Sequence, residues 1–290
     1  MIGVDWGTSS FRAYRLAKNG RLLETRESAR GITTVEAGDF AGTLKSEIGD
    51  WLARGEDRLM LAGMIGSRQG WVEAPYVDCP AGLEEIARAA IALDGLPGVT
   101  ASVVPGLRCR DDFGVPDLLR GEETQILGAL KDLPPWVVVL LPGTHCKHLE
   151  VAGGRILRFK TYMTGEIFAA LKDHTILART VAGEAPDDAA FLDGVRRAAT
   201  GGGLLHHVFG VRARHLVGEL AASAQASYLS GLVIGHELAA ARLESEVALI
   251  GAPHLLRLYD LALRELDVPI RNVRPDAAAR GLYAIAQALG

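Results

Sequence analysis

The sequence predicts an α/β protein with mixed sheets, built from two halves that repeat one arrangement. Two observations carry this prediction. Strand-like and helix-like patterns alternate along both halves of the 290 residues. Each half also opens with a strand, a Gly-Thr turn and a β-hairpin, at 2–27 and again at 136–162. The equivalent positions lie at nearly equal separations, which indicates one structural unit used twice.

Local patterns define the elements of the first half. After a buried strand at 2–7, residues 11–17 alternate as a second strand, and Asn19-Gly20 is a strong hairpin signal before a third strand at 21–27. The further elements expected are a helix at 39–54, a strand at 58–65, a loop at 66–82, a helix at 83–93, a strand at 99–104 and a helix at 121–130. Pro134-Pro135 ends the last helix and marks the predicted domain boundary.

The second half repeats the opening meander and then becomes more helical. A strand at 136–141 precedes Gly143-Thr144, and strands at 145–151 and 155–162 flank the Gly153-Gly154 turn. The further elements expected are helices at 165–179, within 180–203 up to Gly201-Gly202-Gly203, and at 228–243, 253–266 and 276–289, with strands at 247–250 and 269–273.

Bulk composition limits the classes of partner. Hydrophobic residues make up 49% of the chain and charged residues 23%, as in a globular protein, and the net charge of −4 argues against nucleic acid as a partner. Three scattered cysteines and an N-terminus without a basic leader favour a cytoplasmic setting. No apolar run approaches the ~20 residues needed to cross a membrane. The oligomeric state stays open, a homodimer included.

The segment Asp5-Trp6-Gly7-Thr8-Ser9-Ser10-Phe11-Arg12 has the composition of an anion-binding turn. Gly7 permits a tight turn with free N–H groups, and the hydroxyls of Thr8 and Ser9 add donors for phosphate. Asp5 at the strand end is a candidate ligand for Mg²⁺, and Arg12 can offset phosphate charge. The alternative is an ordinary polar hairpin turn capped by Asp5. The segment is neither a GxGxxG fingerprint nor a P-loop.

A second turn of the same kind favours phosphate binding over an ordinary hairpin turn. Gly143 and Thr144 occupy the equivalent place in the second half, and Lys147 stands near them as Arg12 stands near the first turn. Further on, Gly251-Ala252 joins a strand to a helix, where an adenosine could lie against the backbone. Two phosphate-binding turns in equivalent places predict a nucleotide held by both halves.

Two other segments supply candidate catalytic and substrate-binding groups. Glu122 and Glu123 open a helix, where acidic residues often serve only the macrodipole, but where either carboxylate could accept a proton from an attacking hydroxyl. The loop that begins at Gly66 combines cationic, amide, hydroxyl and aromatic groups suited to a carboxylated small ligand. Its candidate contacts are Ser67, Arg68, Gln69, Trp71 and Tyr76.

These motifs together resemble those of the sugar kinase, actin and heat-shock chaperone superfamily. The segment 5–12 resembles its first phosphate motif, Gly143-Thr144 its second, and 250–252 its adenosine motif. Within the superfamily the chain is similar to the 2-dehydro-3-deoxygalactonokinase family. The segments that carry this similarity are 64–83, 120–130, 141–151, 161–171 and 227–238.

The resemblance implies two ribonuclease-H-like, actin-like ATPase domains on either side of a nucleotide cleft. They would be 1–133 joined by the helix 276–290, and 134–275. It implies ATP, Mg²⁺ and phosphorylation of 2-dehydro-3-deoxy-D-galactonate at its 6-hydroxyl. The adenosine motif departs from the family pattern, since Ala252 replaces the second glycine of many superfamily members. Glu122 and Glu123 both remain candidates for the base.

Two other classes of function remain as alternatives. One is a phosphohydrolase of the same superfamily, similar to an exopolyphosphatase, whose Gly-x-Glu-Glu segment resembles 121–123. The other is an actin-like nucleotide-binding protein without enzymatic activity. The loop at 67–76 favours the kinase, because it fits an organic substrate.

Overall fold

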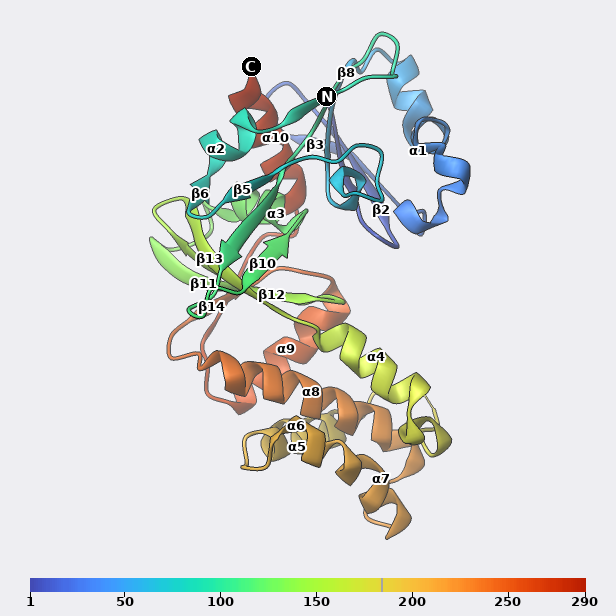
Figure 1. Cartoon of the computed structure of the whole chain (residues 1–290), viewed down its shortest axis with the longest axis vertical. Coiled ribbons are helices and arrows are strands. Elements are labelled where there is room, and N and C mark those ends of the chain that lie inside the picture. The colour runs from blue at the N-terminus through green and yellow to red at the C-terminus, as the bar shows by residue number, and fades with distance from the viewer. Residues whose placement is uncertain (184) are drawn as a thin grey trace. The chain divides into compact units, whose positions relative to one another are not determined.

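The computed structural model describes residues 1–183 and 185–290, which form two compact units (Figure 1). The first unit comprises Met1–Val137, Leu149–Phe159 and Val273–Gly290, and the second comprises Val138–His148 and Lys160–Asn272. Each unit combines helices with sheet strands, and parallel and antiparallel pairs occur in both six-stranded sheets. The predicted α/β class with mixed sheets is therefore confirmed.

The sheet of the first unit has the strand order β3-β2-β1-β4-β8-β7. Its strands are β1 (Ile2–Trp6), β2 (Phe11–Leu16), β3 (Leu22–Ser28), β4 (Arg58–Ala62), β7 (Ile91–Leu93) and β8 (Thr100–Val103). Strands β1, β2 and β3 form an antiparallel meander, whereas β1 pairs with β4 in parallel. The central strand β1 thus has a hairpin on one side and a parallel strand on the other.

The strand order around β11 repeats this pattern. The second six-stranded sheet has the order β15-β14-β11-β12-β13-β6, and β11 pairs with β14 in parallel. Its strands are β6 (Ala81–Gly82), β11 (Trp136–Leu141), β12 (Cys146–Ala152), β13 (Arg155–Tyr162), β14 (Val247–Leu249) and β15 (Ile270–Asn272). Both predicted meanders are present, and each is extended from its first strand by a parallel strand.

Side chains of β1 point alternately to the two faces of the sheet, and a helix packs on each face. Ile2, Val4 and Trp6 are fully buried in a core shared with α1 (Phe40–Ala53). Successive strand side chains point to opposite faces, so Gly3 and Asp5 lie on the other face. There a Cβ on Gly3 would lie 3.0 Å from Leu282 of α10 (Ala277–Leu289), which places α10 on the face that carries Asp5.

Helix α10 lies beside α3 (Glu122–Ala129) in Figure 1, and the two helices touch backbone to backbone. A Cβ on Gly281 would lie 1.7 Å from the carbonyl oxygen of Thr124, and one on Gly128 would lie 1.8 Å from that of Ala277. Arg280 also donates to Asp132 at 2.7 Å. These contacts fix the first turn of α3 relative to β1.

The second unit is mostly helical around its strands. Its helices are α4 (Thr164–His174), α5 (Asp188–Ala198), α6 (Gly203–His207), α7 (Phe209–Leu216), α8 (Gln225–Ala241) and α9 (Pro253–Glu265). Helices α5 and α8 also touch through glycines, since a Cβ on Gly194 would lie 2.2 Å from the Tyr228 carbonyl and one on Gly231 1.9 Å from that of Phe191. Side chains of α5, α8, α9 and strands β11 and β14 form one apolar core.

Several predicted elements need correction. The helix expected at 83–93 ends at Arg88 as α2 (Leu83–Arg88), and β7 follows because Ile91 pairs with Val103 of β8. The loop expected at 66–82 contains β5 (Tyr76–Asp78) and β6, and residues between 104 and 121 contain β9 (Gly106–Arg110) and β10 (Pro116–Leu119). Strands β10, β9 and β5 form a small sheet. The helix expected within 180–203 is α5, which ends before the glycine run, but α6, which begins at the last of these glycines, and α7 were not predicted.

In the described part of the chain, no helix combines the length and apolar character that crossing a membrane requires.

Because α3 and α10 are in backbone contact, adding a single methyl group between them should strongly destabilise the protein. Gly281→Ala should lower the free energy of unfolding by about 3 kcal/mol, because the added Cβ has no room against the Thr124 carbonyl. Urea denaturation measures this change. Gly49→Ala in α1 is the matched control, since nothing lies within 4 Å of its added Cβ. It should stabilise the protein by about 0.5–1 kcal/mol. Equal effects of the two changes would contradict the packing described here.

Candidate active site

Asp5 lies near the carboxyl end of β1, directly opposite Arg12 of β2 in the strand register. Its Oδ2 atom is 3.9 Å from Nη1 of Arg12, and Arg12 is also 3.8 Å from Glu27. The ion pair is loose, and Arg12 is more than one-third exposed. Asp5 and Arg12 therefore lie together near the first turn in the first unit.

Two glycines with positive φ lie beside the Asp5 carboxylate. Gly63 follows β4 with φ of +89°, and a Cβ there would lie 2.8 Å from the Trp6 carbonyl and 3.1 Å from Oδ1 of Asp5. Gly121, with φ of +111°, would place a Cβ 3.2 Å from Gly63 and 3.7 Å from the same Oδ1 atom. Sequence reasoning missed both glycines. The only sequence signal was a glycine directly after a buried strand and one directly before a helix.

The Asp5 carboxylate is buried among these groups, and the burial raises its pKa to about 6. Arg12 lowers the pKa of Asp5, but the negative charge of Glu122 raises it again. Glu122 therefore lies close enough to Asp5 for their charges to interact. This pair of acids favours a bound cation, because a cation would relieve the repulsion between them.

Glu122 and Glu123 differ sharply in environment, although they are neighbours at the start of α3. Glu122 is half-buried, and its Oε2 atom accepts a hydrogen bond from the Arg120 backbone N–H at 3.1 Å. Glu123 is fully buried and accepts from the Gly121 N–H at 2.7 Å. Burial, together with the charge of Glu122, raises the pKa of Glu123 to about 8. Glu123 is thus mostly protonated at neutral pH.

The first Gly-Thr turn closes through a hydrogen bond from the Gly7 N–H to the Ser10 carbonyl at 2.8 Å. Thr8 and Ser9 are exposed at its tip. A second loop braces the turn, since a Cβ on Gly31 would lie 2.2 Å from the Thr8 carbonyl. Gly31 was also missed from sequence, because its role depends on a contact distant along the chain.

The loop at 66–78 begins three residues after Gly63 and presents its predicted groups unequally. Arg68 and Gln69 are exposed, whereas Ser67 is buried. Among the described residues, Arg68 makes no hydrogen bond or ion pair, so its guanidinium is free for a ligand. Trp71 stacks on Phe40, with 6.2 Å between ring centroids, and so anchors the loop to the core.

Arg120 contacts this loop and holds it in place, a role that the sequence did not predict. Its Nη2 atom donates to the Ala74 carbonyl at 2.8 Å, and its guanidinium carbon lies 4.4 Å from the centre of the Tyr76 ring. A Cβ on Gly66 would lie 2.9 Å from its Nη1 atom. Because the Arg120 N–H also binds Glu122, this residue joins the loop to the first turn of α3.

In the second unit, the turn Gly143-Thr144 lies against the N-terminus of α4. A Cβ on Gly165 would lie 2.6 Å from the Gly143 carbonyl, and the Glu166 N–H donates to the Thr144 carbonyl at 3.0 Å. Gly251 approaches the same turn, with a built Cβ 3.3 Å from the Pro142 carbonyl. The predicted residues Gly143, Thr144 and Gly251 are therefore neighbours, and Gly165 joins them as a residue that sequence reasoning missed.

Lys147 differs from the expectation of an open cation beside this turn. It is buried in β12, and its Nζ atom donates to the Thr161 hydroxyl at 2.7 Å. Among the two predicted phosphate cations, Arg12 is thus the more exposed. Beside Thr144, the exposed His145 ring instead binds Glu166, at 2.5 Å.

A cavity of about 780 Å³ opens next to the second turn, within the range of sites for small ligands. Gly143 and Gly165 form one end, the N-terminal parts of α5 and α9 form the walls, and α8 contributes Ser227 and Ser230. Ala252 caps α9, whose His254 and Leu258 line the cavity. The cavity offers both apolar walls and hydroxyl groups, as a nucleoside requires.

A buried hydrogen-bond network holds the walls of this cavity in place. Glu237 of α8 accepts from His148 of β12 at 2.6 Å, from the Tyr259 hydroxyl of α9 at 2.6 Å, and from the Thr164 hydroxyl of α4. Burial alone would raise the pKa of Glu237, but hydrogen bonds from His148, Cys146 and Thr164 together hold it below its usual value.

The side chains of Cys146, His148 and Glu237 include three metal-ligand types, and their donor atoms lie within 4.8 Å of one another. Both carboxylate oxygens of Glu237 already accept hydrogen bonds. We therefore interpret the cluster as a network that positions β12, α4 and α9.

Comparison with known proteins identifies a consistent group of relatives. A sequence model of the family described as 2-keto-3-deoxy-galactonokinase matches residues 5–285. A Rhizobium meliloti (strain 1021) protein named as a probable 2-dehydro-3-deoxygalactonokinase is 40% identical over 298 residues, covering 99% of this chain and 96% of that protein. The 2-dehydro-3-deoxygalactonokinase of Escherichia coli (strain K12) is 31% identical, covering 99% and 98%.

Solved structures extend the comparison to the fold. The crystal structure of a Sinorhizobium meliloti protein described as a 2-dehydro-3-deoxygalactonokinase has a TM-score of 0.91 at 39% identity and covers 99% of this chain and 98% of its own. The Clostridium difficile activator of 2-hydroxyisocaproyl-CoA dehydratase, solved with ADPNP, has a TM-score of 0.51 at 12% identity, covering 99% and 95%. The distant similarity concerns the fold alone and confirms the predicted actin-like ATPase class.

The raised pKa of Asp5 predicts a stability gain when its charge is removed. The folded state favours the protonated acid, so the ionised carboxylate costs stability above pH 6, and this cost disappears as the pH falls towards 4. Asp5→Asn should therefore raise the free energy of unfolding at pH 8 by on the order of 2 kcal/mol. Denaturant titrations at pH 8 and pH 4.5 measure the difference. A gain of equal size at both pH values would show that the carboxylate charge is not its source.

Proposed function

Because the chain belongs to the 2-keto-3-deoxy-galactonokinase family, we propose that it transfers the γ-phosphoryl group of ATP to the 6-hydroxyl of 2-dehydro-3-deoxy-D-galactonate. One observation supports this role most strongly. Asp5 and Glu122 lie close enough for their charges to interact, beside the glycines Gly63 and Gly121. Phosphoryl transfer needs mainly positioning and charge neutralisation, and two neighbouring acids can hold the cation that neutralises phosphate charge.

The Asp5 carboxylate is the residue we assign to Mg²⁺, directly or through water. Carboxylate oxygens are the ligands that Mg²⁺ prefers, and the repulsion between Asp5 and Glu122 fits a cation at this place. The bound ion would neutralise charge on the phosphate oxygens of ATP. The exposed guanidinium of Arg12, held only loosely by Asp5, can turn towards the transferred group. The turn at Gly7, with the Thr8 and Ser9 hydroxyls, would donate to phosphate oxygens.

We assign the role of general base to Glu122. Its carboxylate is partly exposed, whereas that of Glu123 is fully buried and mostly protonated at neutral pH. A base must reach the hydroxyl whose proton it takes and must be ionised when it does so. Glu123 fails both conditions and instead fixes the Gly121 N–H at the start of α3.

The second unit would bind the rest of the nucleotide. The Gly143-Thr144 turn offers backbone N–H groups and a hydroxyl for phosphate, and the adjoining cavity suits adenosine. Gly251 and Ala252 allow close approach at the start of α9. Lys147 would act at longer range, since its ammonium group is bound to Thr161.

The substrate would bind at the loop of 66–78. The free guanidinium of Arg68 can form a two-pronged contact with the substrate carboxylate, with Gln69 beside it. Ser67, Trp71 and Tyr76 would shape the loop from beneath, and Arg120 would hold it against α3. No feature of residues 1–183 and 185–290 favours a phosphohydrolase or a binding protein without activity over this kinase.

Arg68→Ala should raise KM for the sugar acid at least tenfold, because charge-assisted hydrogen bonds to the carboxylate are lost. KM for ATP should stay within about twofold. Coupled steady-state assays measure both constants. Arg21→Ala is the control, since Arg21 is likewise exposed on the first unit but lies in the β2–β3 hairpin. An unchanged KM for the acid would remove Arg68 from substrate binding.

The two neighbouring glutamates should respond differently to the same substitution. Glu122→Gln should lower kcat by about 10²–10⁴-fold, because the amide cannot accept the hydroxyl proton. Glu123→Gln should leave kcat within a few-fold, since glutamine resembles the protonated acid already present. Steady-state rates at saturating substrates decide between them, with circular dichroism to confirm folding. A large loss in Glu123→Gln with a mild one in Glu122→Gln would reverse the assignment.

A further inference from the structure

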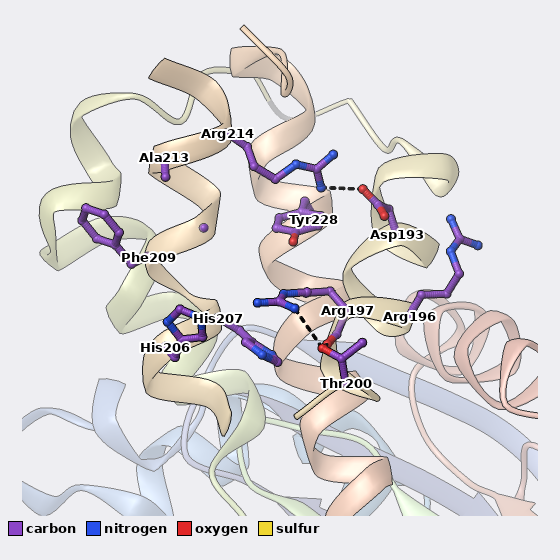
Figure 2. A pocket seen from close by; sticks show the side chains of 11 residues that line it. Asp193, Arg196, Arg197, Thr200, His206, His207, Phe209, Ala213, Arg214 and Tyr228 are labelled. Carbon is purple, nitrogen blue, oxygen red and sulfur yellow. Dashed lines mark hydrogen bonds and ion pairs between the residues drawn. The ribbon is translucent and has the colours of Figure 1, made fainter. Parts of the chain in front are cut away.

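A second cavity, of about 500 Å³, lies in the second unit (Figure 2). It is formed by the C-terminal part of α5, by α6 and α7, and by Tyr228 of α8. It shares no lining residue with the cavity beside the Gly143-Thr144 turn. The function proposed above makes no use of it, although its lining is rich in groups that bind anions.

Three arginines line this second cavity, and two of them are neutralised by neighbouring acids. Arg196 pairs with Glu265 at 3.0 Å, and Arg214 pairs with Asp193 at 2.5 Å. In Figure 2, Arg196 extends away from the histidines of the cavity. Neither of these guanidinium groups is available to a ligand without breaking an ion pair.

Arg197 is the arginine whose charge is left uncompensated. Its Nη1 atom donates to the Thr200 hydroxyl at 2.9 Å, and among the described residues no carboxylate lies within ion-pair distance. Figure 2 shows its guanidinium directed into the space between His207 and Tyr228. The side chain is half-buried, so water screens its charge only in part. It can therefore offer most of its N–H donors to a ligand.

Both ring nitrogens of His207 are held by its own neighbours, which leaves the His206 ring as the imidazole that can donate towards this space. His207 is buried, with Nε2 3.0 Å from the Gly201 carbonyl and Nδ1 3.0 Å from Nε2 of His236. A carbonyl only accepts, so Nε2 of His207 carries its proton and Nδ1 accepts from His236. Burial, with the positive charge of Arg197, lowers the pKa of His236. His206 is exposed at the rim and has a ring free to donate.

We propose that this cavity binds a small organic molecule that carries an oxyanion. The oxyanion, a phosphate or a carboxylate, would bind the guanidinium group of Arg197, with the His206 ring as a further donor. Phe209 and Ala213 of α7 also line the cavity and offer apolar surface to the organic part. The cavity volume is suited to a metabolite and is too small for a peptide or nucleic acid chain.

Titration of the full-length protein with phenyl phosphate and, separately, with benzoate tests this site. Gly210 and Ala213 line the cavity, so their backbone amide chemical shifts in ¹H–¹⁵N spectra should change with probe concentration and reach saturation. Because these amides belong to the cavity, their shifts report binding there and not binding of the probe at another phosphate site. Stronger binding of one probe identifies which oxyanion the site prefers.

Arg197→Ala should weaken the binding of the preferred probe by about tenfold or more, whereas the neighbouring Arg196→Ala should change it less than about twofold. Arg197→Lys keeps the positive charge but loses the planar guanidinium, so its affinity for the probe should lie between those of the two alanine variants. It also replaces Arg197→Ala in the test if that variant does not fold. The proposal is overturned if the Gly210 and Ala213 amides do not move at about 10 mM probe, or if both alanine variants bind equally.

Discussion

Two pairs of helices touch backbone to backbone, α3 with α10 in the first unit and α5 with α8 in the second. In each pair, glycines on both helices stand where larger side chains would separate the helices. The contact in the first unit sets the start of α3, and with it Glu122, against the strand that carries Asp5. The contact in the second unit fixes α8, whose Glu237 ties together three other elements around the nucleotide-sized cavity.

The acids of the two units are buried for different purposes. Glu237 is surrounded by donors, so its charge is stabilised and it holds neighbouring elements in place. Asp5 has one distant cation and a second acid nearby, so its charge is destabilised in the folded protein. An unrelieved carboxylate is a poor structural element but a good ligand for a cation. The contrast distinguishes the acid that stabilises the fold around a cavity from the acid that we propose takes part in the chemistry.

Sequence patterns were sufficient for the repeated meanders, because hairpin turns and strand alternation are local signals. They failed at 89–93, where alanines suggested a continued helix but pairing of Ile91 with Val103 imposed a strand. They also failed for Gly63, Gly121 and Gly165, since a close backbone approach exists only after distant segments have met. The burial of Glu123 and Lys147 was equally invisible, because charged residues are usually exposed.

The position of α10 has a consequence for synthesis of the protein on the ribosome. Residues 277–289 cover the face of β1 that bears Gly3 and Asp5, yet they emerge only after the whole of the second unit. During synthesis, the sheet face that α10 covers lacks this helix until translation is nearly complete. The first unit can therefore complete its packing only after the whole sequence of the second unit has been synthesised.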